Sequence, residues 1–258
     1  MQRFNKLITL TAILMALTLS LGSQPRRQAN IASRQNTEQN NSADSVKKPE
    51  AKGLATIEKF IKPDVKPMKG LTTVYKQDGK FFINVNDSLF GREIIMVTRI
   101  SKAAEGIRSS FDGYAGDQLN SGVFRFERGP DNKIFLRKTY NRERSKDSTQ
   151  AMYEAVLRSN LAAIAATFEI KAQSADKKDN LIDVTDFFGT DSESLFFRKA
   201  SKAAFKLGSI QRESSYVSDI TTYPINTEVK TVKTYMRSDR GETATYELNN
   251  SFVLLPKE

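Results

Sequence analysis

The residue types in this sequence set strict limits on the chemistry that the chain can perform. It contains no histidine and no cysteine, so it lacks the most common general base, the most common metal ligand and any thiolate nucleophile. A Ser-His-Asp or Cys-His arrangement therefore cannot form within these 258 residues. No disulfide can form either, and the lack of cysteine does not indicate a redox compartment.

Several Asp, Asn, Ser and Lys residues have spacings that resemble those of metal-binding or catalytic motifs. Asp112, Asp117 and Asn120 offer oxygen ligands for calcium, but their spacing differs from that of an EF-hand loop, and we favour an ordinary loop. A serine with a lysine three positions later occurs at residues 45–48 and 174–177. Both pairs lie in polar sequence, where a lysine stays solvated and is a poor base, so we attribute them to chance.

Paired carboxylates are the remaining candidates for hydrolysis. Asp183 and Asp186 have the residue types that a glycosidase uses as acid and base. Asp186 and Asp191, however, flank Phe187 and Phe188 just before a predicted helix, where carboxylates usually cap N–H groups and favour the helix dipole. We therefore favour a capping role, and the pattern gives no sign of the cleft that a carboxylate-only hydrolase needs.

The basic side chains form no recognised phosphate or nucleic-acid site. The net charge of +10 becomes 10 − 2 = +8 without Arg3 and Lys6, an excess that favours solubility or a loose attraction to acidic polymers. Basic residues are interleaved with Asp and Glu, and the Gly79-Lys80 pair lacks the upstream glycine of a phosphate loop, so nucleic acid is not an expected partner. One local cluster has the charge to bind phosphate or an acidic glycan, although a solvated hairpin rim is the favoured interpretation. It consists of Arg137, Lys138, Arg142, Arg144 and Lys146.

The N-terminus is typical of a secretory signal peptide. Residues 7–21 form a 15-residue apolar run after a basic start, shorter than the roughly 20 apolar residues of a membrane span. We expect residues 1–22 to be a cleaved signal peptide, with an uncleaved anchor as the alternative. Because no cysteine follows to carry a lipid, the mature protein is expected to be exported, to the periplasm, the outer surface or the medium. Residues 23–52 lack apolar periodicity and predict a disordered linker.

Residues 70–100 give the clearest structural prediction, three β-strands. Residues 71–75 and 81–85 flank Asp78-Gly79, a pair that favours a tight hairpin because both residues tolerate positive φ. Residues 94–97 are apolar on both sides, which predicts the most buried of the three strands. Residues 53–61 carry apolar side chains at helical spacing and predict a short helix packed on this sheet, with partner binding as the alternative.

The rest of the chain predicts further strands and two helices. A capping box from Thr190 to Glu193 predicts a helix over residues 191–206, and residues 152–157 predict one or two helical turns. Strands are predicted at residues 124–126, 134–136, the second half of 161–170, 181–184, 216–222, 228–236 and 244–254.

Together these elements predict an α+β fold, mainly an antiparallel β-sheet arranged as a sandwich or a partly open barrel, with a few short helices. We divide it into a small N-terminal helix plus β-hairpin domain at residues 53–105 and a larger β-rich domain at residues 106–258.

Five segments together carry a family resemblance. They are GLTTVYKQDGKFFINVNDSLFGREIIMVTRI, FRFERGPDNKIFLRKTY, AATFEIKAQ, NLIDVTDFFGTD and TYELNNSFVLLP. In this order they resemble the non-catalytic N-terminal region of large secreted zinc metallopeptidases of Bacteroidetes. That region has a short domain of unknown function, which residues 70–99 resemble, and a longer β-rich domain, which residues 122–256 resemble.

The resemblance implies an accessory role for this chain. The zinc-binding H-E-x-x-H helix of that family lies further along than the segments matched here, so no catalytic, cofactor-binding or metal-binding residue is carried over. We expect a region that supports the folding or substrate positioning of a catalytic metallopeptidase domain, with zinc and hydrolysis belonging to that domain. The alternative is a stand-alone periplasmic or surface module that binds a glycan, a peptide or a protein.

Overall fold

The structure of the protein is a computed structural model that describes residues 53–108, 112–140, 147 and 149–257. The predicted signal peptide, the predicted linker, the serine–lysine pair at residues 45–48 and three members of the basic cluster lie outside the described residues. These three are Arg142, Arg144 and Lys146.

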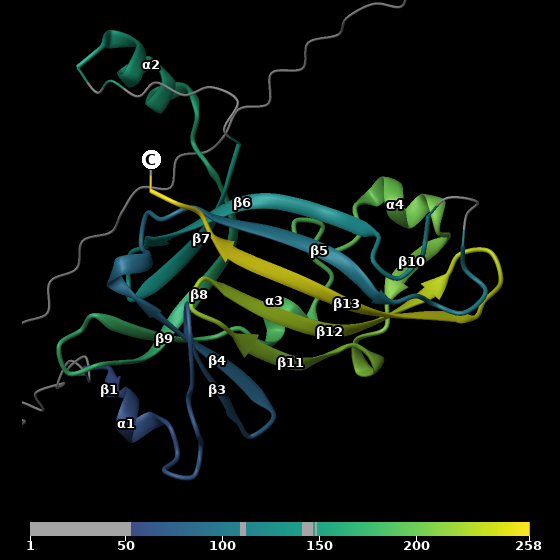
Figure 1. The fold of residues 1–258 in the computed structure, drawn as a ribbon, viewed down its shortest axis with the longest axis horizontal. Coiled ribbons are helices and arrows are strands. Elements are labelled where there is room, and N and C mark those ends of the chain that lie inside the picture. Colours follow the sequence, from purple (N-terminus) through teal and green to yellow (C-terminus); the bar gives the residue numbers. More distant parts are fainter. Residues whose placement is uncertain (1–52, 109–111, 141–146, 148, 258) are drawn as a thin grey trace, which may run out of the picture. The chain divides into compact units, whose positions relative to one another are not determined.

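The described residues form a barrel-like sheet in which the strands are hydrogen-bonded in the order β10-β12-β13-β5-β6-β7-β8-β9-β4-β3-β2 (Figure 1). In addition, β11 pairs with β12, and β1 pairs with β8 in the one parallel ladder among these strands. The prediction of a mainly antiparallel sheet is confirmed, and of the two predicted arrangements the partly open barrel is the one found. The strands are β1 Ala55–Thr56, β2 Met68–Lys69, β3 Thr73–Gln77, β4 Lys80–Asn86, β5 Ile94–Lys102, β6 Gln118–Arg128, β7 Lys133–Thr139, β8 Ala163–Gln173, β9 Asp179–Asp183, β10 Leu207–Ile210, β11 Tyr216–Thr222, β12 Asn226–Arg237 and β13 Thr243–Leu254.

A seam remains where the two ends of the sheet approach each other. The backbone N–H of Leu71 donates to the carbonyl of Tyr223 at 2.6 Å, and the hydroxyls of Thr72 and Thr227 lie 3.2 Å apart. These contacts join the start of β3 to the region between β11 and β12 without a continuous ladder. The sheet is therefore nearly closed.

The predicted hairpin is confirmed, with Asp78 and Gly79 at φ 51° and 75° between β3 and β4. The following strand, β5, does not pair with this hairpin but lies between β13 and β6. Its inner residues Ile94 and Met96 are buried, whereas Ile95 on the other side is only half-buried. The prediction that residues 94–97 form the most buried of the three strands is therefore wrong, because two of these four residues are only half-buried. The more deeply buried strand is β4, with Phe81, Phe82, Ile83 and Val85 buried.

The helices are short. The predicted helix at residues 53–61 is confirmed only at Ile57–Phe60, because Ala55–Thr56 form β1. Its Ile57 belongs to one buried cluster with Phe82 and Leu181 of the sheet. The predicted turns at residues 152–157 are confirmed within α2. The helices are α1 Ile57–Phe60, α2 Ala151–Ser159, α3 Thr185–Gly189 and α4 Lys199–Ala204, with 3-10 turns η1 Asp87–Leu89 and η2 Arg212–Ser214.

The predicted helix at residues 191–206 is wrong over its first half. Thr190 is the C-cap of α3, not the N-cap of a new helix, and helical structure resumes only at α4. In between, Leu195, Phe196 and Phe197 are completely buried. Three consecutive buried side chains cannot share one face of a helix, so tertiary packing overrides the local capping signal.

Candidate functional site

Residues 189–198, here called the inner segment, cross the inner face of the sheet. Strands present buried polar side chains to its backbone: Thr98 donates its hydroxyl to the carbonyl of Leu195, and Asn250 donates to Thr98. A buried irregular backbone must find partners for its carbonyls. The polar residues on the inner face supply these partners and fix the path of the segment.

Asn120 makes the most extensive of these contacts. Its amide donates to the carbonyls of Glu193 at 2.8 Å and Phe196 at 3.0 Å, while its oxygen accepts from the guanidinium of Arg198 at 2.8 and 3.0 Å. The side chain is 2% exposed. Every hydrogen-bonding direction of this amide toward the inner segment is thus in use.

The three residues considered as calcium ligands do not form one site. Asp117 accepts the backbone N–H groups of Gly113 and Tyr114, both at 2.8 Å, and so closes its own turn. Asn120 points into the core, and Asp112 is exposed. Within the described residues, no group of three acidic side chains is placed to hold a metal ion. The loop interpretation fits these contacts.

Lys233 lies fully buried on the inner face of β12. Its ammonium donates to the carbonyls of Phe188 and, at 2.7 Å, Thr190, and it lies 4.1 Å from the centre of the Phe196 ring. Burial lowers the pKa of Lys233 to about 7, against an opposing pull from Asp191. The lysine therefore ties the end of α3 to the sheet.

Of the two carboxylates considered for hydrolysis, Asp183 has structural partners. Asp183 accepts the N–H of Thr185 at 3.0 Å and lies 3.3 Å from the ammonium of Lys80. Asp186 lies in the first turn of α3, whose N-cap, Val184, forms no side-chain cap. It is thus Asp183, not Asp186, that binds an N–H group at this helix start.

Asp191 does not cap a helix, so the predicted capping role is wrong for this residue. Its two oxygens accept the hydroxyl of Tyr235 at 3.0 Å and the ammonium of Lys202 at 2.5 Å. The ion pair of Asp191 with Lys202 is largely buried. Through Asp191, Lys202 of α4 is connected to Tyr235 of β12. A carboxylate held in this way by a cation and a phenol is a structural anchor.

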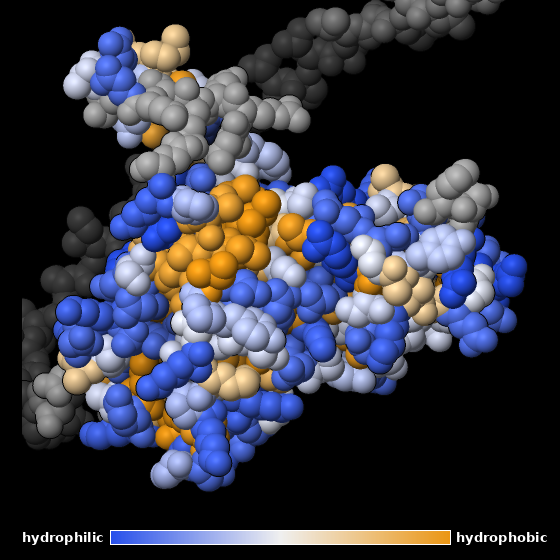
Figure 2. Space-filling view, in the orientation of Figure 1, coloured by the Kyte–Doolittle hydropathy of each residue, from blue (hydrophilic) through white to orange (hydrophobic). Residues whose placement is uncertain are grey.

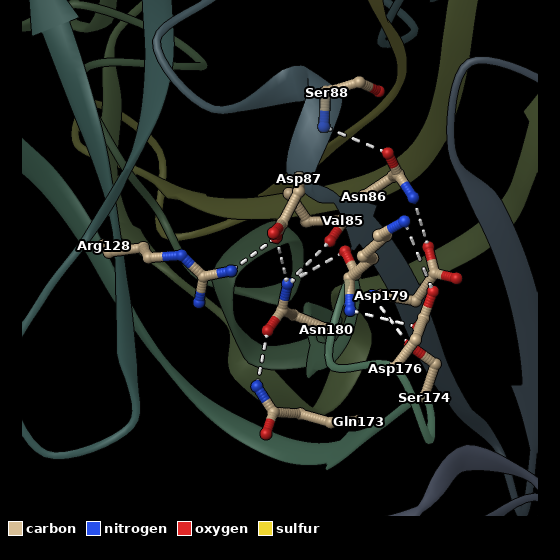
Figure 3. Close-up of polar contacts among 11 residues, drawn as sticks. Val85, Asn86, Asp87, Ser88, Arg128, Gln173, Ser174, Asp176, Asp179 and Asn180 are labelled. Carbon is tan, nitrogen blue, oxygen red and sulfur yellow. Dashed lines mark hydrogen bonds and ion pairs between the residues drawn. The ribbon is translucent and has the colours of Figure 1, made fainter.

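A polar cluster joins the ends of four strands, and Figure 3 shows its two parts: Asp87 and Gln173 contact Asn180, and Asn86 contacts Asp179. The amide of Asn180 donates to the carbonyl of Val85 at 3.1 Å and to the carboxylate of Asp87, which also pairs with Arg128. Asn86 donates to Asp179 at 2.7 Å. These contacts hold the β8–β9 turn against β4.

The second serine–lysine pair lies beside this cluster. Ser174 donates its hydroxyl to Asp176, and Lys177 has a positive φ of 59° in the turn. The two residues are joined through the backbone, where the N–H of Lys177 donates to the carbonyl of Ser174 at 2.9 Å, while the serine hydroxyl is engaged with the acid. An open groove of about 330 Å³ runs past it. Its lining residues are Gly53, Leu54, Thr56, Asn132, Gln173, Ser174, Ala175 and Lys177.

The described members of the basic cluster also have partners. Arg137 pairs with Glu127 and donates to the carbonyl of Ala162 at 2.6 Å, while the ammonium of Lys138 lies 5.7 Å from the ring of Tyr140. These contacts fit the hairpin-rim interpretation for both residues.

An apolar patch on the outer side of the sheet is the feature that sequence reasoning missed. Figure 2 shows it where β13, β5 and β6 lie side by side. Ile95 is paired with Val123 on one side and Val253 on the other. Each of these residues alternates with a side chain on the inner face, so its own side chain points outward. We call this patch the outer face; it consists of Ile95, Val97, Val123, Val253 and Leu255, all half-buried.

Comparison with known families finds two family models, which match different parts of this sheet. The family model of the domain of unknown function DUF5117 matches residues 116–258, and that of DUF5118 matches residues 54–103. The chain belongs to the DUF5117 family. No curated protein and no solved structure matches it.

The DUF5117 and DUF5118 regions are joined in one compact unit. β5 of the DUF5118 region lies between β13 and β6 of the DUF5117 region, and β4 pairs with β9. Both the outer face and the inner core therefore contain residues from both regions. Among the described residues, no helix has the length and apolarity to cross a bilayer.

Proposed function

We propose that this chain is a non-catalytic accessory region of a secreted zinc-dependent metallopeptidase, and that its outer face packs against the catalytic domain. The outer face is the observation that carries the proposal. In an antiparallel sheet with one solvated side, outward positions are ordinarily polar. Here the outward positions at one end of three adjacent strands are apolar, whereas positions further along them, such as Ser121 and Asn249, are polar. A contiguous apolar patch supports an interaction site.

The rim of the outer face suggests the charge of the partner. Arg99, the next outward residue after Val97 on β5, is exposed. Arg125, which follows Val123 on β6, instead pairs with Glu127 at 2.7 Å. An apolar centre with an arginine at its rim is complementary to an apolar surface that carries a carboxylate at the matching edge. In this proposal zinc and its ligands belong to the catalytic domain.

The test is to mix the purified chain with a separately expressed catalytic domain and to measure binding, refolding yield and peptide turnover. We expect binding that Val97→Lys and Val253→Lys weaken at least tenfold, because each places a charge in a desolvated interface. Val232→Lys is the matched control, since Val232 also points outward from a strand but lies outside the outer face. Absence of any effect of the wild-type chain on the catalytic domain would contradict the proposal.

The alternative, a module that binds a glycan or peptide, has one observation in its favour. The groove of about 330 Å³ beside the β8–β9 turn is open and bordered by amide and hydroxyl groups. Screening the chain against a panel of immobilised glycans tests this alternative. Binding that Gln173→Ala abolishes would favour it over the accessory role.

A further inference from the structure

A small apolar cavity lies inside the barrel-like sheet, separate from the outer face. Its volume is about 50 Å³. The lining side chains come from both family regions, and include Ile83, Ile94, Phe124, Val184 and Val229. The cavity thus exists only because the two regions close on each other.

The polar groups at the cavity wall are already satisfied. Thr72 and Thr227 are the two hydroxyl-bearing residues in its lining, and their hydroxyls lie 3.2 Å from each other. The hydroxyl of Thr227 also lies 3.1 Å from that of Thr222. A buried water needs two to four polar partners, and these hydroxyls are used among themselves. The cavity is therefore suited to an apolar occupant.

The cavity reaches the surface on one side. Four of its lining residues are half-buried rather than buried: Leu71, Phe126, Phe187 and Phe252. Next to Leu71, across the seam, Tyr223 and Ile225 are exposed by 49% and 62%. A ligand that enters the cavity can therefore continue over an apolar mouth.

The size of the cavity selects the shape of its ligand. An engineered cavity of about 150 Å³ holds benzene. A space of about 50 Å³ is too small for a ring and fits the narrow end of an unbranched chain. We infer that the cavity receives the end of an unbranched alkyl chain, with the rest of the chain lying over the mouth. The source is a free fatty acid or a lipid acyl chain.

The test is a fluorescence titration of the full chain with cis-parinaric acid, a linear polyene fatty acid. We expect saturable binding with one site per chain. Val229→Phe fills the cavity and should weaken binding at least tenfold, with folding checked by circular dichroism and thermal unfolding. Because filling a packed core can destabilise it, a second variant, Leu71→Trp, blocks the half-buried mouth and should have the same effect.

Val97→Lys is the control, because it alters the outer face and leaves the cavity intact. Unsaturable binding by the wild type, or binding lost in Val97→Lys but retained in folded Val229→Phe, would overturn the inference. Displacement of the probe by oleate would support the inference and identify a free fatty acid as the ligand. Displacement by phosphatidylcholine vesicles would support the inference and identify a lipid acyl chain as the ligand. Displacement by neither overturns it. The result is independent of the accessory role, since Val229→Phe should leave binding to the catalytic domain unchanged.

Discussion

At the scale of single residues, the buried Lys233 couples stability to pH. Its pKa is lowered from 10.5 to about 7 in the folded chain. Between these values the unfolded chain holds a proton that the folded chain does not, so the free energy of unfolding should rise with pH, by at most about 1.4 kcal/mol per unit. Below about pH 7 both states are protonated and this contribution is constant.

The measurement is urea unfolding at pH 7 and pH 9, compared with Lys233→Met. In the Lys233→Met variant, the free energy of unfolding should no longer rise between pH 7 and pH 9. The variant should also be less stable at pH 9 by about 1–3 kcal/mol for each buried carbonyl left without a donor. Burial raises the pKa of Tyr246 to about 12, so this tyrosine stays neutral in the window. An equal pH dependence in both proteins would contradict the assignment to Lys233.

A second prediction at this scale concerns Asn120. Asn120→Leu leaves the carbonyls of Glu193 and Phe196 without this donor, and should lower the free energy of unfolding by about 1–3 kcal/mol per carbonyl. Gln118→Leu, at an exposed position of the same strand, should change it by less than about 0.5 kcal/mol. Addition of calcium or a chelator should leave the unfolding temperature unchanged, and a rise with calcium would restore the ligand interpretation.

At the scale of elements, the β3–β4 turn depends on the conformation of one glycine. Gly79 has φ 75° and nothing lies within 4 Å of where a Cβ would stand, so the cost of Gly79→Ala is conformational alone. We expect a loss of about 1–2 kcal/mol, measured by urea unfolding. Gly189→Ala is the matched control, because it also has open space but no positive φ, and it should be neutral or slightly stabilising. Equal effects of the two changes would contradict this account.

Elements that depend on local signals were predictable from the sequence. The Asp78-Gly79 pair specified its hairpin, and the alternation at residues 244–254 specified β13. The inner segment was not predictable, because its conformation depends on distant side chains such as Thr98 and Asn250 that bind its carbonyls. The capping box at Thr190 predicts a helix that would begin there, but packing of the inner segment prevents that helix from forming.

At the scale of the whole molecule, strand identity was predictable but strand pairing was not. Nothing local indicates that Asn86 pairs with Asp179, or Ile95 with Val253. The outer face depends on these pairings, because it forms only when valines and an isoleucine from three strands meet. A sequence-based search for catalytic residues also could not detect a surface whose side chains carry no chemistry.

These pairings predict that neither predicted domain folds alone. Residues 53–105 include β4 and β5, whose partners β9, β13 and β6 all lie in residues 106–258. Each fragment expressed separately should lack a cooperative thermal transition, and co-expression should restore it. A cooperative transition in either isolated fragment would contradict this prediction and would support two autonomous domains.

The inner segment also has a consequence for how the protein is made. Two of its anchors, Thr98 and Asn120, are synthesised before it, and two others, Lys233 and Asn250, are synthesised after it. A nascent chain on the ribosome therefore cannot enclose this segment until the last two strands have emerged. Folding dominated by such distant contacts is slow, so this part of the newly made chain stays accessible to chaperones and proteases at least until β12 and β13 have left the ribosome.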